Sequence, residues 1–160
     1  MRAAWHTSPR ETCRRPGPER KAIGAIVDKL PEDAPYGLNH AKPVLLVGEA
    51  VLDGKIAAAS GDKAAAADVY RKAIALQDQL NYDEPQDWYY PVRETLGAAL
   101  FIDGDITGAE AVFRSDLERN LGNGRSLYGL SKALEAPKNH GIRLGAIAVQ
   151  GRLGQGRRAT

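Results

Sequence analysis

Apolar residues recur at helical spacing along the middle of the chain, and glycine and aspartate separate the recurring segments. Between residues 106 and 119, apolar side chains follow at intervals of 3, 4 and 4, at Ile106, Ala109, Phe113 and Leu117. This spacing places them on one face of an α-helix. Few stretches alternate between apolar and polar residues as strands do, so the pattern predicts an all-α protein.

The same pattern predicts five helices in the centre of the chain. They span residues 44–59, 63–80, 88 or 91 to 102, 106–119 and 125–135. Two turns, Ser60-Gly61-Asp62 and Asp103-Gly104-Asp105, share one design. Glycine can end a helix in the left-handed conformation, and the following aspartate can cap the next helix. Because both turns join helices of similar length, they indicate an internal repeat of helix hairpins.

The flanking segments lack this periodicity, so the helical domain is predicted to span residues 44–136. Residues 1–43 are predicted to be largely disordered or linker, with a short helix at 22–30 and a proline-rich lead-in at 31–43. Residues 137–160 form a basic, glycine-rich tail without acidic residues, and we predict that they are poorly ordered.

One 34-residue unit, from Tyr90 to Asn123, carries the clearest repeat. Its small and large positions are Leu96-Gly97, Leu100, Ala109 and Phe113, and with them the unit resembles the tetratricopeptide repeat family. The resemblance implies stacked antiparallel helix hairpins in a short right-handed α-solenoid. The unit departs from the family pattern at three positions, where Arg93, Asp116 and Leu121 stand in place of Trp, Ala and Pro.

Two weaker units flank the clear one. The unit at residues 47–80 is followed near residues 79–87 by an apparent insertion, and the unit that begins at Gly124 lacks a second helix. The segment from Tyr82 to Glu94 also resembles the final repeats of longer bacterial members of the family. The residues expected in the repeat core are Gly54, Ala66, Tyr70, Ala73, Leu96, Gly97, Leu100, Ala109, Phe113, Leu127, Leu130 and Leu134.

A helix hairpin cannot bury both of its faces alone, so neighbouring hairpins must stack. Gly97 and Ala109 let two backbones approach closely, and Phe113 fills the space beside them. Two and a half repeats are fewer than the three that such stacks usually need. We therefore expect residues 22–30 or a partner chain to cover an exposed face, and self-association through such faces stays open.

Charge is distributed unevenly along the chain. Residues 1–43 hold 8 Lys and Arg against 5 Asp and Glu, residues 44–136 hold 9 against 15, and residues 137–160 hold 5 against none. The predicted domain is therefore acidic, at net −6, which argues against a nucleic-acid-binding surface and favours a neutral or basic partner peptide. The basic ends are interpreted as solvated tails, although contact with nucleic acid or with the acidic domain is an alternative.

The sequence holds no convincing catalytic, cofactor or metal constellation. His6, His40 and His140 lie apart in the flanking segments, and Cys13 has no second cysteine. Asp103 to Gly108 resembles the start of a calcium-binding loop, but the twelfth position is Arg114 instead of a bidentate glutamate. The glycine-rich run at residues 151–156 lacks the strand and helix that a phosphate loop needs.

No apolar run is long enough to span a membrane, and a reducing, cytoplasmic setting is the default expectation. The best candidate functional cluster is the aromatic run before the third helix with the two charged residues that follow, and its members are Trp88, Tyr89, Arg93 and Glu94. The rings either pack the insertion onto the preceding helix pair or line a concave groove that binds a peptide, where aromatic and arginine side chains are frequent anchors.

The sequence therefore predicts a non-enzymatic scaffold that binds a peptide or partner protein through its helical-repeat surface. The alternative is a structural accessory C-terminal domain, or fragment, of a larger bacterial enzyme or envelope protein.

Overall fold

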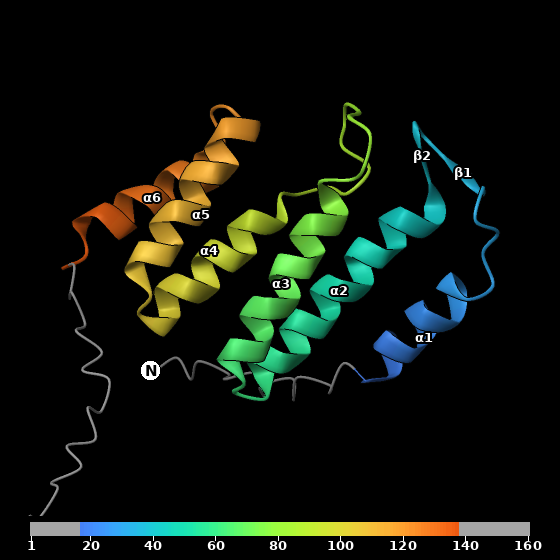
Figure 1. The fold of residues 1–160 in the computed structure, drawn as a ribbon, viewed down its shortest axis with the longest axis horizontal. Coiled ribbons are helices and arrows are strands. Elements are labelled where there is room, and N and C mark those ends of the chain that lie inside the picture. Colours follow the sequence, from blue (N-terminus) through green and yellow to red (C-terminus); the bar gives the residue numbers. More distant parts are fainter. Residues whose placement is uncertain (1–16, 138–160) are drawn as a thin grey trace, which may run out of the picture.

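The described part of the chain, residues 17–137 of a computed structural model, is mostly helical, which confirms the all-α prediction. Its elements are α1 (Gly17–Val27), β1 (Pro35–Tyr36), β2 (Asn39–His40), α2 (Ala41–Ala59), α3 (Lys63–Gln77), α4 (Val92–Asp103), α5 (Ile106–Arg119) and α6 (Gly124–Glu135). The helices lie side by side in chain order, with α1 at one edge and α6 at the other (Figure 1). Each helix from α2 to α6 packs against the next.

Several sequence predictions concern residues outside the described range. They are the disorder of residues 1–16 and 138–160, the glycine-rich run at 151–156, and the solvated or unpaired state of Cys13, His6 and His140.

The two glycine–aspartate turns have the geometry that the sequence predicts. Gly61 and Gly104 adopt φ angles of +83° and +87°, in the left-handed region that ends a helix. Asp62 accepts a hydrogen bond from the backbone N–H of Ala65 at 3.0 Å, and Asp105 accepts one from Gly108 N–H at 2.9 Å. Both aspartates therefore cap the helix that follows, as predicted.

The N-terminal part is more ordered than the sequence suggests. Helix α1 begins at Gly17 instead of residue 22 and ends at Val27 instead of residue 30. Its first turn contains Pro18 and Glu19, which favour a helix start. Arg20 forms ion pairs with two carboxylates of α2, from Glu49 and Asp53, and so fixes α1 against α2.

The predicted linker at residues 31–43 is also shorter than expected. It contains the antiparallel β1–β2 hairpin, in which Pro35 lies opposite His40, and α2 already begins at Ala41. Pro43 fits in α2 because it lies in the first turn, where its missing N–H has no intrahelical acceptor.

The hairpin is held to the loop between α3 and α4. Asn39 Oδ1 accepts from the backbone N–H of Asn81 at 2.7 Å, and Asn81 Nδ2 donates to the carbonyl of Leu38 at 2.8 Å. Asn39 Nδ2 donates to Asp87 at 2.7 Å. These side chains form an asparagine clasp, Asn39, Asn81 and Asp87, that joins two loops more than 40 residues apart in sequence.

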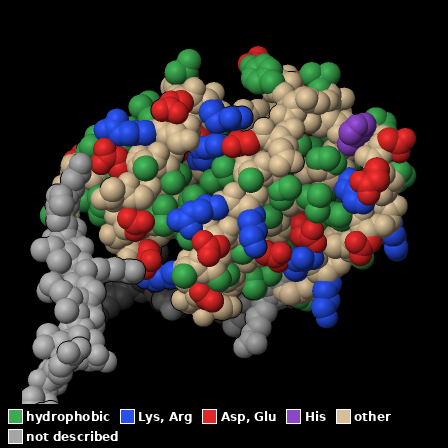
Figure 2. Space-filling model, viewed as in Figure 1, with side chains coloured by type: hydrophobic (Ala, Val, Ile, Leu, Met, Phe, Trp, Pro, Cys, Tyr) green, Lys and Arg blue, Asp and Glu red, His purple; other side chains and the backbone are tan. Residues whose placement is uncertain are grey.

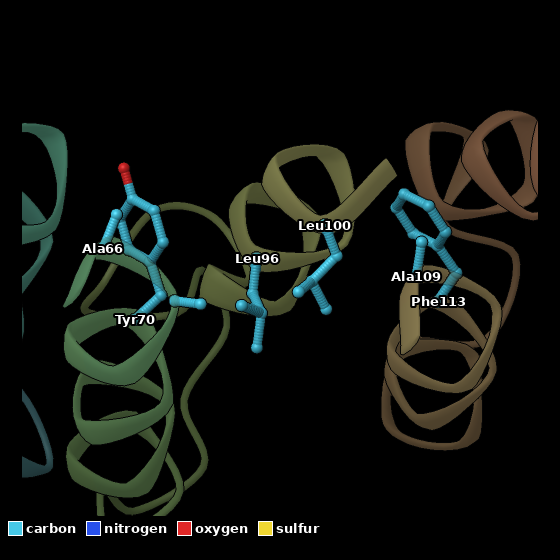
Figure 3. Close-up of a cluster of buried hydrophobic side chains, with 7 residues drawn as sticks. Ala66, Tyr70, Leu96, Leu100, Ala109 and Phe113 are labelled. Carbon is cyan, nitrogen blue, oxygen red and sulfur yellow. The ribbon is translucent and has the colours of Figure 1, made fainter. Parts of the chain in front are cut away.

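Two clusters of buried side chains form the core. The larger one joins α3, α4 and α5, and its members include Ala66, Tyr70, Leu96, Leu100, Ala109 and Phe113 (Figure 3). The second joins α2, α3 and α4 through Val47, Val51, Ala73 and Val92. Predicted core positions 54, 66, 70, 73, 96, 97, 100, 109 and 113 are buried in the structure.

The predicted core face of α6 is wrong in part. Leu127 and Leu134 are 50% and 48% exposed, and Leu130 is partly buried. Instead, α6 turns its small residues inward, with Ser126 and Ala133 both fully buried. The reason is Phe113, whose ring leaves no room for a larger residue, since a Cβ added to Gly129 would lie 2.4 Å from Phe113 Cζ.

Candidate functional site

The aromatic run immediately before α4 forms a compact group of rings. The centroids of Trp88 and Tyr89 are 5.4 Å apart, those of Trp88 and Tyr90 5.7 Å, and those of Tyr89 and Tyr90 4.7 Å. Trp88 packs against the second core cluster, where a Cβ on Gly48 would lie 3.0 Å from its ring. Its Nε1 is the one buried side-chain nitrogen or oxygen within residues 17–137 that lacks a hydrogen-bond partner. Tyr89, by contrast, is 79% exposed.

Arg93 is engaged in a bidentate ion pair inside the molecule. Its two terminal nitrogens donate to the two carboxylate oxygens of Asp78 at 2.7 and 2.6 Å. This hydrogen bonding lowers the pKa of Asp78 and raises the pKa of Arg93. Arg119 lies 3.5 Å from the same carboxylate. Since the Arg93 side chain is only 12% exposed, it joins α3 to α4 and leaves little surface for a ligand.

Glu94 is held in a polar network with the start of α6. Its Oε1 accepts from Asn123 Nδ2 at 2.8 Å, and Arg125 lies 3.8 Å from its Oε2. Its side chain is 12% exposed. The structure thus brings the four candidate residues to the start of α4, but three of them have intramolecular roles. Tyr89 is the member that presents most of its side chain to solvent.

Asp116 is the centre of the network, and sequence reasoning registered it only as a departure from the repeat pattern. The carboxylate is fully buried and accepts hydrogen bonds from Asn120 Nδ2 at 2.8 Å, Asn123 Nδ2 at 2.7 Å and Ser126 Oγ at 2.5 Å. A charge buried without such partners would be very costly, so these donors make the position tolerable. The one sequence signal that could have indicated this network is the presence of three hydrogen-bond donors, Asn120, Asn123 and Ser126, shortly after Asp116.

A groove of about 800 Å³ lies beside this network, between α3, α4 and α6. Its surface is mainly apolar, and most of the apolar side chains that line it are alanines or aromatics. The alanines are Ala58, Ala66, Ala67, Ala98 and Ala99, and the aromatics are Tyr70, Tyr90, Phe101, Phe113 and Tyr128. Burial raises the pKa of Tyr70 and Tyr90, so both phenols are uncharged at neutral pH. Ile102 and Tyr128 are 78% and 67% exposed and leave apolar surface at the margin.

The charged residues that line the groove are mostly paired with nearby side chains of opposite charge. Lys63 lies 2.7 Å from Asp103, and Lys132 lies 2.6 Å from Glu135 and 5.7 Å from the centre of the Tyr128 ring. Basic and acidic side chains are interspersed on the face shown in Figure 2, without a patch of one sign. The groove therefore offers apolar surface bordered by internally compensated charges.

A second, more open depression of about 790 Å³ connects the aromatic run to the groove. The two share Tyr90, Glu94, Thr95 and Arg125 as lining residues. The depression also includes Tyr89 and, from α2, Lys55. The exposed ring of Tyr89 therefore lies along the same continuous surface as the alanine-lined groove.

The other candidate chemistry has structural explanations. Asp103, Gly104 and Asp105, at the start of the calcium-loop resemblance, form an ion pair, a helix end and a helix cap respectively. In residues 17–137, no group of three or more His, Cys, Asp or Glu side chains is arranged to hold a metal ion. Over the same range, no helix combines the length and apolar character that crossing a bilayer requires.

Comparisons of the chain with protein-family models, with curated proteins and with solved structures found no match.

Proposed function

We propose that this protein is a non-enzymatic scaffold that binds a peptide segment of a partner protein in the apolar groove between α3, α4 and α6. The observation that carries the proposal is the groove itself, about 800 Å³ in volume, whose apolar lining is mainly alanine and aromatic side chains. Most ligand sites are concave and mainly apolar, with few polar groups. Alanines on facing helices leave hollows into which large apolar side chains of a bound helix can insert.

In this proposal the helices form a short solenoid of the tetratricopeptide type. Three features support it. The turns at Gly61 and Gly104 repeat one geometry, α2 to α5 form two successive hairpins, and Gly54 and Gly97 lie in equivalent contact with an aromatic ring. A Cβ on Gly54 would lie 2.4 Å from Tyr70, and one on Gly97 would lie 2.6 Å from Phe113.

The peptide is apolar in its anchoring residues, with no requirement for a strong charge. The groove is lined by Lys63, Arg125 and Lys132 against Glu94 and Asp103, so its own charge is nearly balanced although residues 17–137 are acidic. Affinity then comes from burial of aliphatic or aromatic side chains. The fit of large residues into alanine hollows supplies the specificity.

The test is selection of ligands from a displayed library of random peptides, followed by binding to variants of the full chain. Ala98 is exposed and lines the groove, so Ala98→Trp should fill the hollow and weaken the selected peptides at least about tenfold, or 1.4 kcal/mol. Ala111→Trp is the matched control, because Ala111 is exposed on α5 and does not line the groove.

A third variant separates the groove from the aromatic run. Tyr89→Ala should weaken those peptides that extend into the adjoining depression and leave shorter peptides unaffected. Selected peptides that bind Ala98→Trp and Ala111→Trp equally well would overturn the proposal, as would a library that yields no binders.

A further inference from the structure

Helix α6 has one packed face and one open apolar face. Its packed face consists of small residues, with Ser126 and Ala133 fully buried and Gly129 against the Phe113 ring. Leu127 and Leu134 lie on the other face, about half exposed, with the partly buried Leu130 between them. The intervals of 3 and 4 residues align these three leucines in one stripe, here named the leucine stripe.

The leucine stripe lies at one end of the row of helices. At the opposite end, α1 covers the outer side of α2 and buries Val27 (Figure 1). Within residues 17–137, α6 packs on α4 and α5, and no element follows it. The terminal helix of such a stack normally presents a polar outer face, so an open stripe of leucines is a suitable docking surface.

The area of the stripe argues against a second copy as its occupant. A stable interface buries roughly 800 Å² on each partner. Three leucines, each already about half buried or more, supply far less than that. A segment tethered to α6 has no such requirement, because a short connection holds it at an effective concentration in the millimolar range.

We propose that residues 142–149 of the same chain dock on the leucine stripe. The chain leaves α6 directly after the stripe, at Pro137, and the apolar residues of the following stretch are Ile142, Leu144, Ile147 and Val149. The five residues from Pro137 to Ile142 can span about 17 Å when extended. That reach suffices, since Leu127 and Leu134 are about 10 Å apart along the helix.

Charge favours the same arrangement. Residues 17–137 hold 13 Lys and Arg against 19 Asp and Glu, net −6, whereas residues 138–160 hold five basic residues and no acidic one. Arg143 lies within the docked segment and the other four basic residues flank it, so the tail as a whole brings a net charge of opposite sign to the acidic body. The role of this contact is to close the end of the stack, so it is independent of peptide binding in the groove.

Disulfide trapping in the full chain tests the contact directly. In a Cys13→Ser background, Leu134→Cys combined with Ile142→Cys should form an intrachain disulfide under mild oxidation. Glu135→Cys combined with Ile142→Cys is the matched control, since Glu135 is exposed next to Leu134 on α6, lies outside the leucine stripe and has nearly the same tether length. We expect the first pair to cross-link at least tenfold faster. Equal rates, or a covalent dimer as the main product of the first pair, would overturn the proposal.

Hydrogen exchange provides a second test without added cysteines. Ile142→Asp with Val149→Asp should speed amide exchange in α6 at least tenfold and leave α2 and α3 unchanged. Gln150→Asp with Gly154→Asp adds the same charge outside the apolar positions and should have little effect. Faster exchange in α4 with α6 unchanged would place the segment in the groove instead, and unchanged exchange throughout would mean that it does not dock; either result overturns the proposal.

Discussion

At the scale of single residues, the polar groups at the start of α4 and α6 are stabilising elements of the fold. Asp116 is buried with three donors, and Glu94 shares one of them through Asn123. A buried carboxylate of this kind is tolerable only while its donors are in place. Substitution of Asp116 therefore affects every member of the network.

Asp116→Ala should destabilise the protein although alanine is the residue that the repeat pattern favours at this position. The variant leaves the side chains of Asn120, Asn123 and Ser126 without their buried acceptor. We expect a loss on the order of 3 kcal/mol in the free energy of unfolding, measured by chemical denaturation. The exposed Asp68→Ala serves as control, and a neutral Asp116→Ala would contradict the network described here.

The ion pair between Asp78 and Arg93 predicts a defined dependence on pH. Because Arg93 lowers the pKa of Asp78 in the folded state, the contribution of the pair is complete above the ordinary aspartate value of about 3.9 and is lost as the pH falls through the lower folded value. Asp78→Asn should cost about 1–2 kcal/mol at neutral pH. Its deficit in melting temperature should shrink as the pH falls from 5 to 2.

The matched control for this series is Asp68→Asn, which removes an exposed pair with Arg71 on the same helix. Its effect should be small at every pH. A deficit of Asp78→Asn that stays constant down to pH 2 would show that the charge of Asp78 does not stabilise the fold.

At the scale of elements, two glycines of neighbouring helices make room for one aromatic ring. An added Cβ would lie 2.6 Å from the Phe113 ring at Gly97 and 2.4 Å from it at Gly129. Both distances are well inside van der Waals contact, and the ring is enclosed in the core. Helix α4 and helix α6 can therefore approach α5 closely only because these positions lack a side chain.

Gly97→Ala should destabilise the protein by about 1–3 kcal/mol through overpacking, although alanine is intrinsically the better helix former by about 1 kcal/mol. Gly124→Ala is the control, since Gly124 lies in the first turn of α6 with no atom within 4 Å of an added Cβ. It should be neutral or slightly stabilising. Thermal unfolding of both variants gives the comparison, and equal melting temperatures would refute the close approach at Gly97.

The same glycines explain how far the sequence could predict the elements. Apolar spacing together with glycine and aspartate turns was sufficient for α3, α4 and α5, because these signals are local. The rotation of α6 was not predictable, since leucines at 127 and 134 favour burial and only the contact of Gly129 with Phe113 turns them outward. The extent of α1 likewise depends on ion pairs of Arg20 with residues about 30 positions away.

The candidate site shows the same limit. Sequence reasoning selected Trp88, Arg93 and Glu94 because aromatic and charged residues cluster there, but their partners Asp78 and Asn123 come from other helices. The groove could not be predicted from the sequence for a different reason. Alanines spread over α2, α3 and α4 carry no local signal, and they form a surface only when the hairpins stack.

At the scale of the whole molecule, the two core clusters share helices. Both include residues of α3 and α4, and Ile74 packs against both. Such continuity couples the hairpins, since one cannot lose its packing without exposing apolar surface of the other. The described helices are therefore expected to unfold as one cooperative unit.

Phe113→Ala, in the first cluster, should lower the stability of this unit by about 3–5 kcal/mol. In a Trp5→Phe background, the fluorescence of Trp88 reports on the second cluster, and circular dichroism reports on all helices. Both probes should give one coincident transition at a lower denaturant concentration. Trp88 fluorescence that stays at its original midpoint would show that the hairpins unfold independently.

The asparagine clasp also distinguishes the two ends of the α2–α3 hairpin as sites for protein engineering. A reporter domain inserted within residues 81–87 would separate Asn81 from Asp87 and so release the β1–β2 hairpin. The turn at Gly61 lies at the other end of α2 and α3, and no atom lies within 4 Å of an added Cβ there. Inserted domains are best tolerated at exposed turns of this kind. Insertion of a domain at residue 61 is accordingly the preferred format for attaching a sensor to this fold.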